Sequence, residues 1–211
     1  TAYLSDTYNR MEQKFRAECH RMNGRIPYIS IDGAYPTWDE SMINWWTNGF
    51  WGGIMWQLYH AENNSDYMSE ANCLEEHLEK AFEHFDLLDH DVGFLWLHTA
   101  VAHYRLTGDP TARQRGLRAA AVLASRYCPA GEYIRAWNRP GLSQMIIDCV
   151  MNLPLLFWAA SEGAGDHYRQ IAIHHLDRVL THIIREDGSC NHIVEFDEAT
   201  GEVLNIPGGQ G

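Results

Sequence analysis

Two aspartates, Asp91 and Asp148, have the surroundings expected of carboxyl groups that do chemistry. Asp91 lies in "LDHDVGF", directly before an apolar run, and Asp148 lies inside "MIIDCVMNLPLLFW". Taken alone, Asp91 fits a helix cap, because acids accept hydrogen bonds from the free N–H groups of a first helical turn. Asp148 has apolar neighbours on both sides, and burial beside a second carboxyl raises a carboxyl pKa. A carboxyl that is protonated at neutral pH can act as a general acid, so the pair predicts acid–base catalysis.

Helical hairpins are the elements that must position these aspartates. Residues 67–85 and 168–184 carry apolar residues on one helical stripe, which predicts helices exposed on one side. Three other segments are apolar nearly all round and should be enclosed: "GFWGGIMWQLYHA", "VGFLWLHTAVAHYRL" and "CVMNLPLLFWAA". The sequence therefore predicts a repeated order of buried helix, tight turn and amphipathic helix.

One spacing relates three of these units. Each turn carries an aspartate placed to cap the outer helix that follows: Asp66, Asp109 and Asp166. Counting back 18 residues from each leads to Asn48, Asp91 and Asp148, which we expect to open the buried helices. Equivalent positions of stacked hairpins lie on the same rim, so these three residues should converge at one end of the inner helices.

Stacked hairpins can form an open superhelix or close into an α/α toroid, and inner helices that are apolar on every side favour the toroid. About three and a half hairpins are recognisable, too few for closure. We therefore expect an all-α chain forming one α/α-toroid domain over residues 1–211 that is incomplete at its C-terminus. The segment "SCNHIVEFDEATGEVLN" alternates apolar and polar residues around a turn, which predicts a β-hairpin.

Composition narrows the classes of partner and location. Sixteen basic against 28 acidic residues give a formal charge of −12, which disfavours nucleic acid and anionic membranes as partners. The sequence shows no apolar run near the ~18 residues of a membrane span and no leader pattern, so we expect a soluble cytoplasmic protein, or a periplasmic one if a leader was removed. The five widely spaced cysteines favour reduced thiols.

Aromatic and polar residues indicate the kind of ligand. The eight tryptophans and ten tyrosines favour carbohydrate, because aromatic faces pack on sugar rings, although such residues also fill cores. The sequence has no metal-ligand motif, nucleophile elbow, phosphate loop or dinucleotide fingerprint, so we expect no metal and no cofactor. His90, His192 and Gln210 are candidate donors beside the carboxyl groups, and we expect all three to contact the substrate. Arg135 and the histidines are the cations available to offset the acidic charge near an anionic ligand.

Longer motifs resemble, in order, those of the unsaturated glucuronyl hydrolases, glycoside hydrolase family 88. The resemblance covers about residues 25–211 and rests on "WTNGFWGGIMWQLYHA", "HDVGFLWLHTAVAHYRLTGD", "IIDCVMNLPLLFWAASE", "IREDGSCNHIVEFDEATGE" and "GQG". It implies an (α/α)6 toroid, of which this chain would hold the first half to two-thirds. It also implies an enzyme that removes a 4,5-unsaturated uronic acid from the nonreducing end of disaccharides and short glycosaminoglycan-type oligosaccharides left by lyases.

The same resemblance implies hydrolysis through hydration of the vinyl ether double bond. Asp148 would be general acid and base, protonating carbon 4 and activating water for carbon 5, and Asp91 would hold the ring hydroxyls on carbons 2 and 3. The remaining pocket positions implied are His192 and Gln210 toward the uronate or water, and Trp45 or Trp46 and Trp137 as stacking platforms. Two alternatives stay open: a hydrolase for pectin-derived unsaturated galacturonyl units on the same fold, and a non-catalytic sugar-binding helical repeat.

Overall fold

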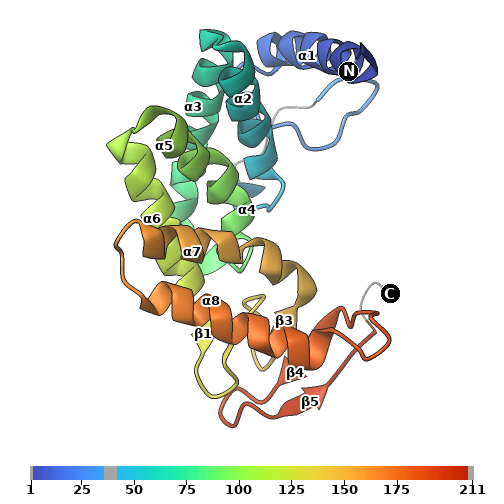
Figure 1. The fold of residues 1–211 in the computed structure, drawn as a ribbon, viewed down its shortest axis with the longest axis vertical. Coiled ribbons are helices and arrows are strands. Elements are labelled where there is room, and N and C mark those ends of the chain that lie inside the picture. The colour runs from blue at the N-terminus through green and yellow to red at the C-terminus, as the bar shows by residue number, and fades with distance from the viewer. Residues whose placement is uncertain (1, 36–41, 209–211) are drawn as a thin grey trace.

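Stacked helical hairpins make up most of the computed structural model, which describes residues 2–35 and 42–208 (Figure 1). Helix α1 (Ala2–Met22) lies at one end, and the first hairpin pairs α2 (Asn48–Glu62) with α3 (Ser65–Glu79), which continues as a 3-10 turn over Lys80–Leu87. The second hairpin has an inner arm of α4 (Val92–Trp96), a π-helical turn (Leu97–Val101) and α5 (Ala102–Thr107), and an outer arm, α6 (Pro110–Ser125). The third pairs α7 (Leu153–Ser161) with α8 (His167–Arg178), extended by Val179–Ile183. The predicted order of buried helix, turn and outer helix is confirmed three times.

The starts of the three inner arms pack unusually close together. A Cβ atom on Gly49, near the start of α2, would lie 2.1 Å from the carbonyl oxygen of Phe94 in α4. A Cβ atom on Gly93 would lie 2.6 Å from the Cα atom of Asn152, which directly precedes α7. Only glycine permits such an approach of backbones. The predicted convergence of the inner-helix starts is therefore confirmed.

The predicted outer-helix caps are confirmed in part. Asp109 accepts a hydrogen bond from the Ala112 N–H at 2.8 Å and caps α6. The cap of α3 is Asn64 and not Asp66, whose own N–H it accepts, and Asp166 precedes α8 without a side-chain cap bond. The 18-residue spacing thus located the starts of the outer helices and of α2 and α4, whereas Asp148 does not open the third inner helix, because a 3-10 turn over Ile147–Met151 comes before α7 begins at Leu153.

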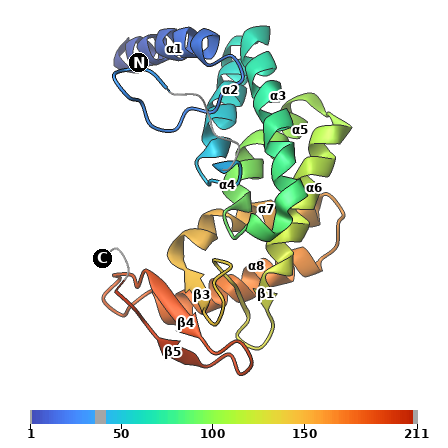
Figure 2. The ribbon, with the colours of Figure 1, turned by 180° about the vertical axis from the view of Figure 1, so that it is seen from behind.

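Two small antiparallel sheets interrupt the helices. Strands β1 (Tyr127–Cys128) and β2 (Tyr133–Ile134) form one, and β3 (Ser143–Ile146), β4 (Ile193–Phe196) and β5 (Val203–Asn205) form the other, beside α8 (Figure 2). The predicted hairpin is β4–β5. Strand β3 was not predicted, because its four residues are all buried and show no alternation. Its pairing with β4 extends to a hydrogen bond from the Ile147 N–H to the His192 carbonyl at 3.0 Å, which brings the C-terminal segment beside Asp148.

The inner arms are not enclosed on every side within the described residues. An apolar groove of about 860 Å³ runs between α1, α2 and the α4–α5 arm, lined by Phe15, Phe50, Ile54, Leu58, Leu97 and Leu106 among others. The described residues therefore enclose the inner helices on some sides only, as expected of part of a toroid, and their full enclosure stays a prediction for a closed ring. In the described ranges, no helix combines the length and apolar character needed to cross a bilayer.

Candidate active site

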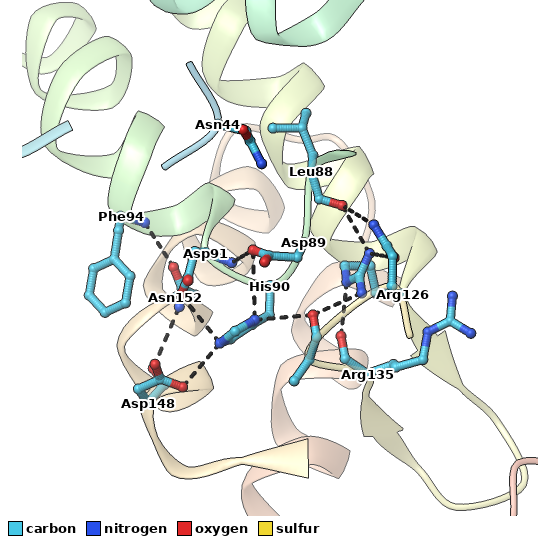
Figure 3. A network of polar contacts seen from close by, with 12 residues as sticks. Asn44, Leu88, Asp89, His90, Asp91, Phe94, Arg126, Arg135, Asp148 and Asn152 are labelled. Carbon is cyan, nitrogen blue, oxygen red and sulfur yellow. Dashed lines mark hydrogen bonds and ion pairs between the residues drawn. The ribbon is translucent and has the colours of Figure 1, made fainter. Parts of the chain in front are cut away.

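A buried imidazole, that of His90, joins the two aspartates singled out by the sequence (Figure 3). Its Nε2 atom lies 3.0 Å from Asp148 Oδ1 and 3.3 Å from Asp91 Oδ1, and its side chain is 1% exposed. The two aspartates come from successive hairpins, one at the start of α4 and one in the 3-10 turn over Ile147–Met151 that precedes α7. The fold thus places both carboxyl groups against one ring.

The ring of His90 faces acceptors on both sides. Its Nδ1 atom lies 3.1 Å from the Ala136 carbonyl oxygen, which can only accept, and Nε2 faces the Asp148 carboxyl group. Burial lowers the pKa of His90, but the hydrogen bond to Asp148 and the charges of Asp91, Asp148 and Asp89 outweigh burial and raise it. Because both nitrogens bind protein atoms in the interior, we reassign His90 from substrate contact to positioning of the carboxyl groups.

Asp91 is the more deeply buried carboxyl, with a side chain 13% exposed. It stands at the N-cap position of α4, yet its side chain makes no cap hydrogen bond. Its Oδ1 atom is buried and has no hydrogen-bond partner among the described residues, although His90 is near enough for charge attraction. Burial raises the pKa of Asp91 to about 7; His90 opposes the rise, and Asp89 and Asp148 add to it. Helix capping, the simpler interpretation of this residue, is therefore wrong.

Asp148 is more open than its sequence neighbours predicted. Its side chain is 41% exposed, because the 3-10 turn directs it away from the buried Cys149 beside it. The burial argument made from the sequence was wrong for Asp148 and applies to Asp91. The result is a carboxyl that accepts a hydrogen bond from His90 through Oδ1 and remains accessible to a ligand.

The predicted stacking residues lie near this cluster and are partly exposed. Trp137 meets His90 edge to face, with ring centroids 5.8 Å apart. The ring centroid of Trp46 lies 5.7 Å from that of Phe94, in the first turn of α4, and 6.4 Å from that of Trp45. Trp45 and Trp46 are each 38% exposed. Exposed aromatic faces beside polar groups suit the apolar faces of sugar rings.

The remaining predicted site residues differ in where they lie relative to Asp148. The backbone of His192 lies beside the Asp148 turn, as described above, whereas Gln210 lies outside the described residues. Arg135 pairs with Glu198 at 3.3 Å, and its guanidinium points away from Asp148 (Figure 3), so it does not supply the expected cation there. Arg139 was not predicted; its Cζ atom lies 4.5 Å from the centre of the Trp137 ring, and no acid pairs with it in the described part of the chain. Its place two residues after Trp137 was the only signal available.

Sequence comparison with known proteins shows the family to which this chain belongs. An unsaturated chondroitin disaccharide hydrolase of Streptococcus pyogenes serotype M1 is 36% identical over 176 residues, which are 81% of this chain and 43% of that protein. An unsaturated glucuronyl hydrolase of Bacillus sp. (strain GL1) is 34% identical over 191 residues, 87% of this chain and 50% of that protein. The chain belongs to the unsaturated glucuronyl hydrolase family. A scan against models of protein families gave no match.

Solved members of the unsaturated glucuronyl hydrolase family share the fold. The structure from Streptococcus agalactiae superimposes with a TM-score of 0.85 at 29% identity, covering 96% of this chain and 53% of that one. The structure from Bacillus sp. GL1 gives 0.84 at 30% identity, with 93% and 53% coverage. The hairpins described here are thus an α/α-toroid arrangement, and the chain spans about half the length of the relatives it matches. The prediction of an incomplete domain stays a prediction.

One group of side chains has the spacing of metal ligands among the residues described. Ligand atoms of Asp89, His90 and Asp91 lie within 4.8 Å of one another. An imidazole binds a metal through an unprotonated nitrogen, and both nitrogens of His90 are turned to the Ala136 carbonyl and to Asp148. The group therefore does not fit a metal site.

Two residues that support the site by hydrogen bonds to the backbone were not predicted from the sequence. Arg126 donates to the carbonyl oxygens of Leu88, Arg135 and Ala136 and so fixes the turn before Asp91. Asn152 is fully buried, and its Oδ1 atom accepts a hydrogen bond from the Phe94 N–H at 2.8 Å. A lone amide directly before the apolar run of α7 was the signal for Asn152; nothing local marked Arg126.

Proposed function

We propose that this protein is an unsaturated glucuronyl hydrolase that removes a 4,5-unsaturated uronic acid from the nonreducing end of glycosaminoglycan-type disaccharides and short oligosaccharides. The observation that carries the proposal is the meeting of Asp91 and Asp148 on one buried histidine beside partly exposed tryptophans. The names of the relatives support it, as does a solved relative complexed with dGlcA-GalNAc6S.

Asp148 is the residue to which we assign proton transfer. The substrate double bond joins carbons 4 and 5 and is part of an enol ether. The carboxyl group of Asp148 gives its proton to carbon 4, water adds to carbon 5, and the carboxylate takes the proton that this water loses. The resulting hemiketal opens and releases the partner sugar. His90 fixes Oδ1 of Asp148, and the exposure of the side chain lets it reach the ligand.

Asp91 is assigned to the ring hydroxyls on carbons 2 and 3. Its buried Oδ1 atom lacks a hydrogen-bond partner among the described residues, and a buried acceptor left in this state is costly. Because this atom is itself covered, we assign the contact with a substrate hydroxyl to the exposed part of the Asp91 side chain, which is 13% exposed. Trp137, Trp45 and Trp46 supply apolar faces for the sugar, and Gln210 and His192 stay proposed contacts of the uronate or water.

The uronate carboxylate must bind close to acidic side chains. The surrounding carboxyl groups raise the pKa of His90, and the protonated ring offsets part of this repulsion, because the Asp91 and Asp148 carboxyl groups lie within 3.3 Å of it. Arg139, beside Trp137, is the cation that we add to the predicted set. No cofactor or metal has a step in this scheme, and a cytoplasmic location stays a prediction.

An assay of lyase-generated disaccharides tests the proposal. The complete natural chain is supplied with unsaturated disaccharides from hyaluronan, chondroitin, heparin and pectin, and loss of the ultraviolet absorbance of the conjugated alkene is followed. We expect turnover of the glycosaminoglycan products. Faster turnover of the pectin product would favour the galacturonyl alternative, and binding without turnover would favour the non-catalytic one.

Asp148→Asn tests the assigned role. The amide keeps the shape and removes the transferable proton, so we expect a loss of roughly 10²–10⁴-fold in rate. Asp6→Asn, at an exposed position of α1, is the matched control and should keep full activity. Near-normal turnover by a folded Asp148→Asn enzyme contradicts the mechanism.

A further inference from the structure

Asn152 caps a helix that is not its own. It directly precedes α7 but makes no side-chain cap bond there. Its Oδ1 atom instead accepts the N–H of Phe94, the third residue of α4, in the neighbouring hairpin. In an ordinary N-cap this N–H is accepted by the side chain of the residue that precedes the helix. For α4 that residue is Asp91.

The position of Asp91 therefore depends on Asn152. With the Phe94 N–H already bound, the Asp91 carboxyl group has no cap bond and keeps one buried oxygen without a partner among the described residues. We propose that Asn152 is a positioning residue, which caps α4 from the neighbouring hairpin and thereby leaves the Asp91 carboxyl group available to substrate hydroxyls. This inference rests on the proposed function for the role of Asp91.

Packing holds the amide in this place. A Cβ atom on Gly93 would lie 2.4 Å from Asn152 Oδ1, so α4 presses directly on the amide. The Nδ2 atom of Asn152 lies 3.5 Å from the Asp148 carbonyl oxygen, at the long limit for a hydrogen bond. The side chain thus stands between the start of α4 and the turn that carries Asp148, as Figure 3 shows.

An amide suits this position better than a carboxylate. Either group accepts the Phe94 N–H, but a carboxylate would add another buried negative charge beside Asp91 and Asp148. The asparagine accepts without charge, and it lowers the pKa of Asp91, opposing in part the rise caused by burial. Alanine or serine lacks the reach to accept this N–H and leaves it for Asp91.

A double-mutant cycle in the complete natural chain tests the inference. We expect Asn152→Ala to lower kcat/KM roughly 10²-fold, as misplacement of a substrate-holding group does. In an Asp91→Asn background the same change should have little further effect, since Asn152 acts through Asp91. Asp109→Ala, which removes the ordinary cap of α6, is the matched control: it should lower Tm comparably and leave kcat/KM unchanged. Losses that multiply in the double variant would overturn the inference.

Two further measurements on Asn152→Ala distinguish a positioning role from a purely structural one: the pH profile of kcat/KM and a crystal structure of the variant. In Asn152→Ala, Asp91 loses the hydrogen bond from Asn152 and gains the one from the Phe94 N–H, so the acid limb of kcat/KM should shift, whereas it should stay in place in Asp109→Ala. A crystal structure of the variant should show Asp91 hydrogen-bonded to the Phe94 N–H at about 2.9 Å; an unmoved carboxyl group refutes the inference. If Asn152→Ala does not fold, Asn152→Ser serves for both measurements. A wild-type enzyme inactive on every unsaturated disaccharide refutes the proposed function, and the variant structure still decides the role of Asn152.

Discussion

Replacing Asp91 with asparagine should change how the stability of the fold depends on pH. Burial raises the pKa of this carboxyl from 3.8 to about 7 in the folded protein. Below pH 3.8 the Asp91 carboxyl group holds its proton in both the folded and the unfolded protein, and between pH 3.8 and about 7 it holds the proton only in the folded protein. The folded protein therefore loses stability as the pH rises toward 7, and the loss is complete above it. Asparagine keeps the shape and cannot titrate, so the variant lacks this contribution.

The size of this effect on the free energy of unfolding follows from the shift in the pKa of Asp91. A difference of about three pH units corresponds to about 4 kcal/mol, at roughly 1.4 kcal/mol a unit. The side chain is well buried, so solvent screening reduces this figure little. Asparagine also removes the attraction between Asp91 and His90, which together with the hydrogen bond to Asp148 raises the pKa of His90. We therefore expect the free energy of unfolding of Asp91→Asn, relative to wild type, to increase by about 2–4 kcal/mol between pH 4 and pH 8.

Urea unfolding of both proteins at pH 4, 6 and 8 measures this difference. Asp6→Asn, exposed on α1, is the control and should follow the wild type at every pH. Wild-type and Asp91→Asn stabilities that run parallel from pH 4 to pH 8 would refute the argument that burial controls this carboxyl group.

Two further predictions concern packing and metal dependence. Gly93→Ala should lower the free energy of unfolding by about 1–3 kcal/mol and reduce turnover, because the new methyl group collides with Asn152. Urea unfolding measures the first effect and the disaccharide assay the second. A variant with unchanged stability and turnover would contradict the close packing of Gly93 on Asn152. Turnover should persist after treatment with a chelator, since the proposed chemistry is proton transfer alone; lost activity that a divalent ion restores would contradict this.

The helical hairpins could be predicted from the sequence because their signals are local. A helical stripe needs only its own residues, and the 18-residue spacing located Asn48, Asp91 and the turn of Asp148 near the starts of the inner arms. Strand β3 could not be predicted, since its partner β4 lies far along the chain and its buried residues show no alternation.

Exposure at the site was harder to predict than position. Asp148 has apolar sequence neighbours but a 41% exposed side chain, because a 3-10 turn and the β3–β4 pairing set its direction. Asp91 has charged neighbours in sequence but is buried against His90, which directly precedes it, and against Asn152 of the next hairpin. Apolar neighbours in sequence predict burial only where the secondary structure directs the side chain inward, and that direction depends on distant contacts.

Two aspartates at equivalent helix positions show what separates a structural carboxyl from a reactive one. Asp109 and Asp91 both precede a helix, α6 and α4. Asp109 accepts the Ala112 N–H, and this hydrogen bond holds its pKa below the ordinary value, so it stays charged and fixed. Asp91 is denied the corresponding N–H by Asn152, and burial then raises its pKa to about 7. The opposite pKa shifts of the same residue type at the same helix position follow from burial and from whether a backbone donor is available. A neighbouring hairpin that supplies the cap can therefore free an N-terminal acid for chemistry without leaving the helix uncapped.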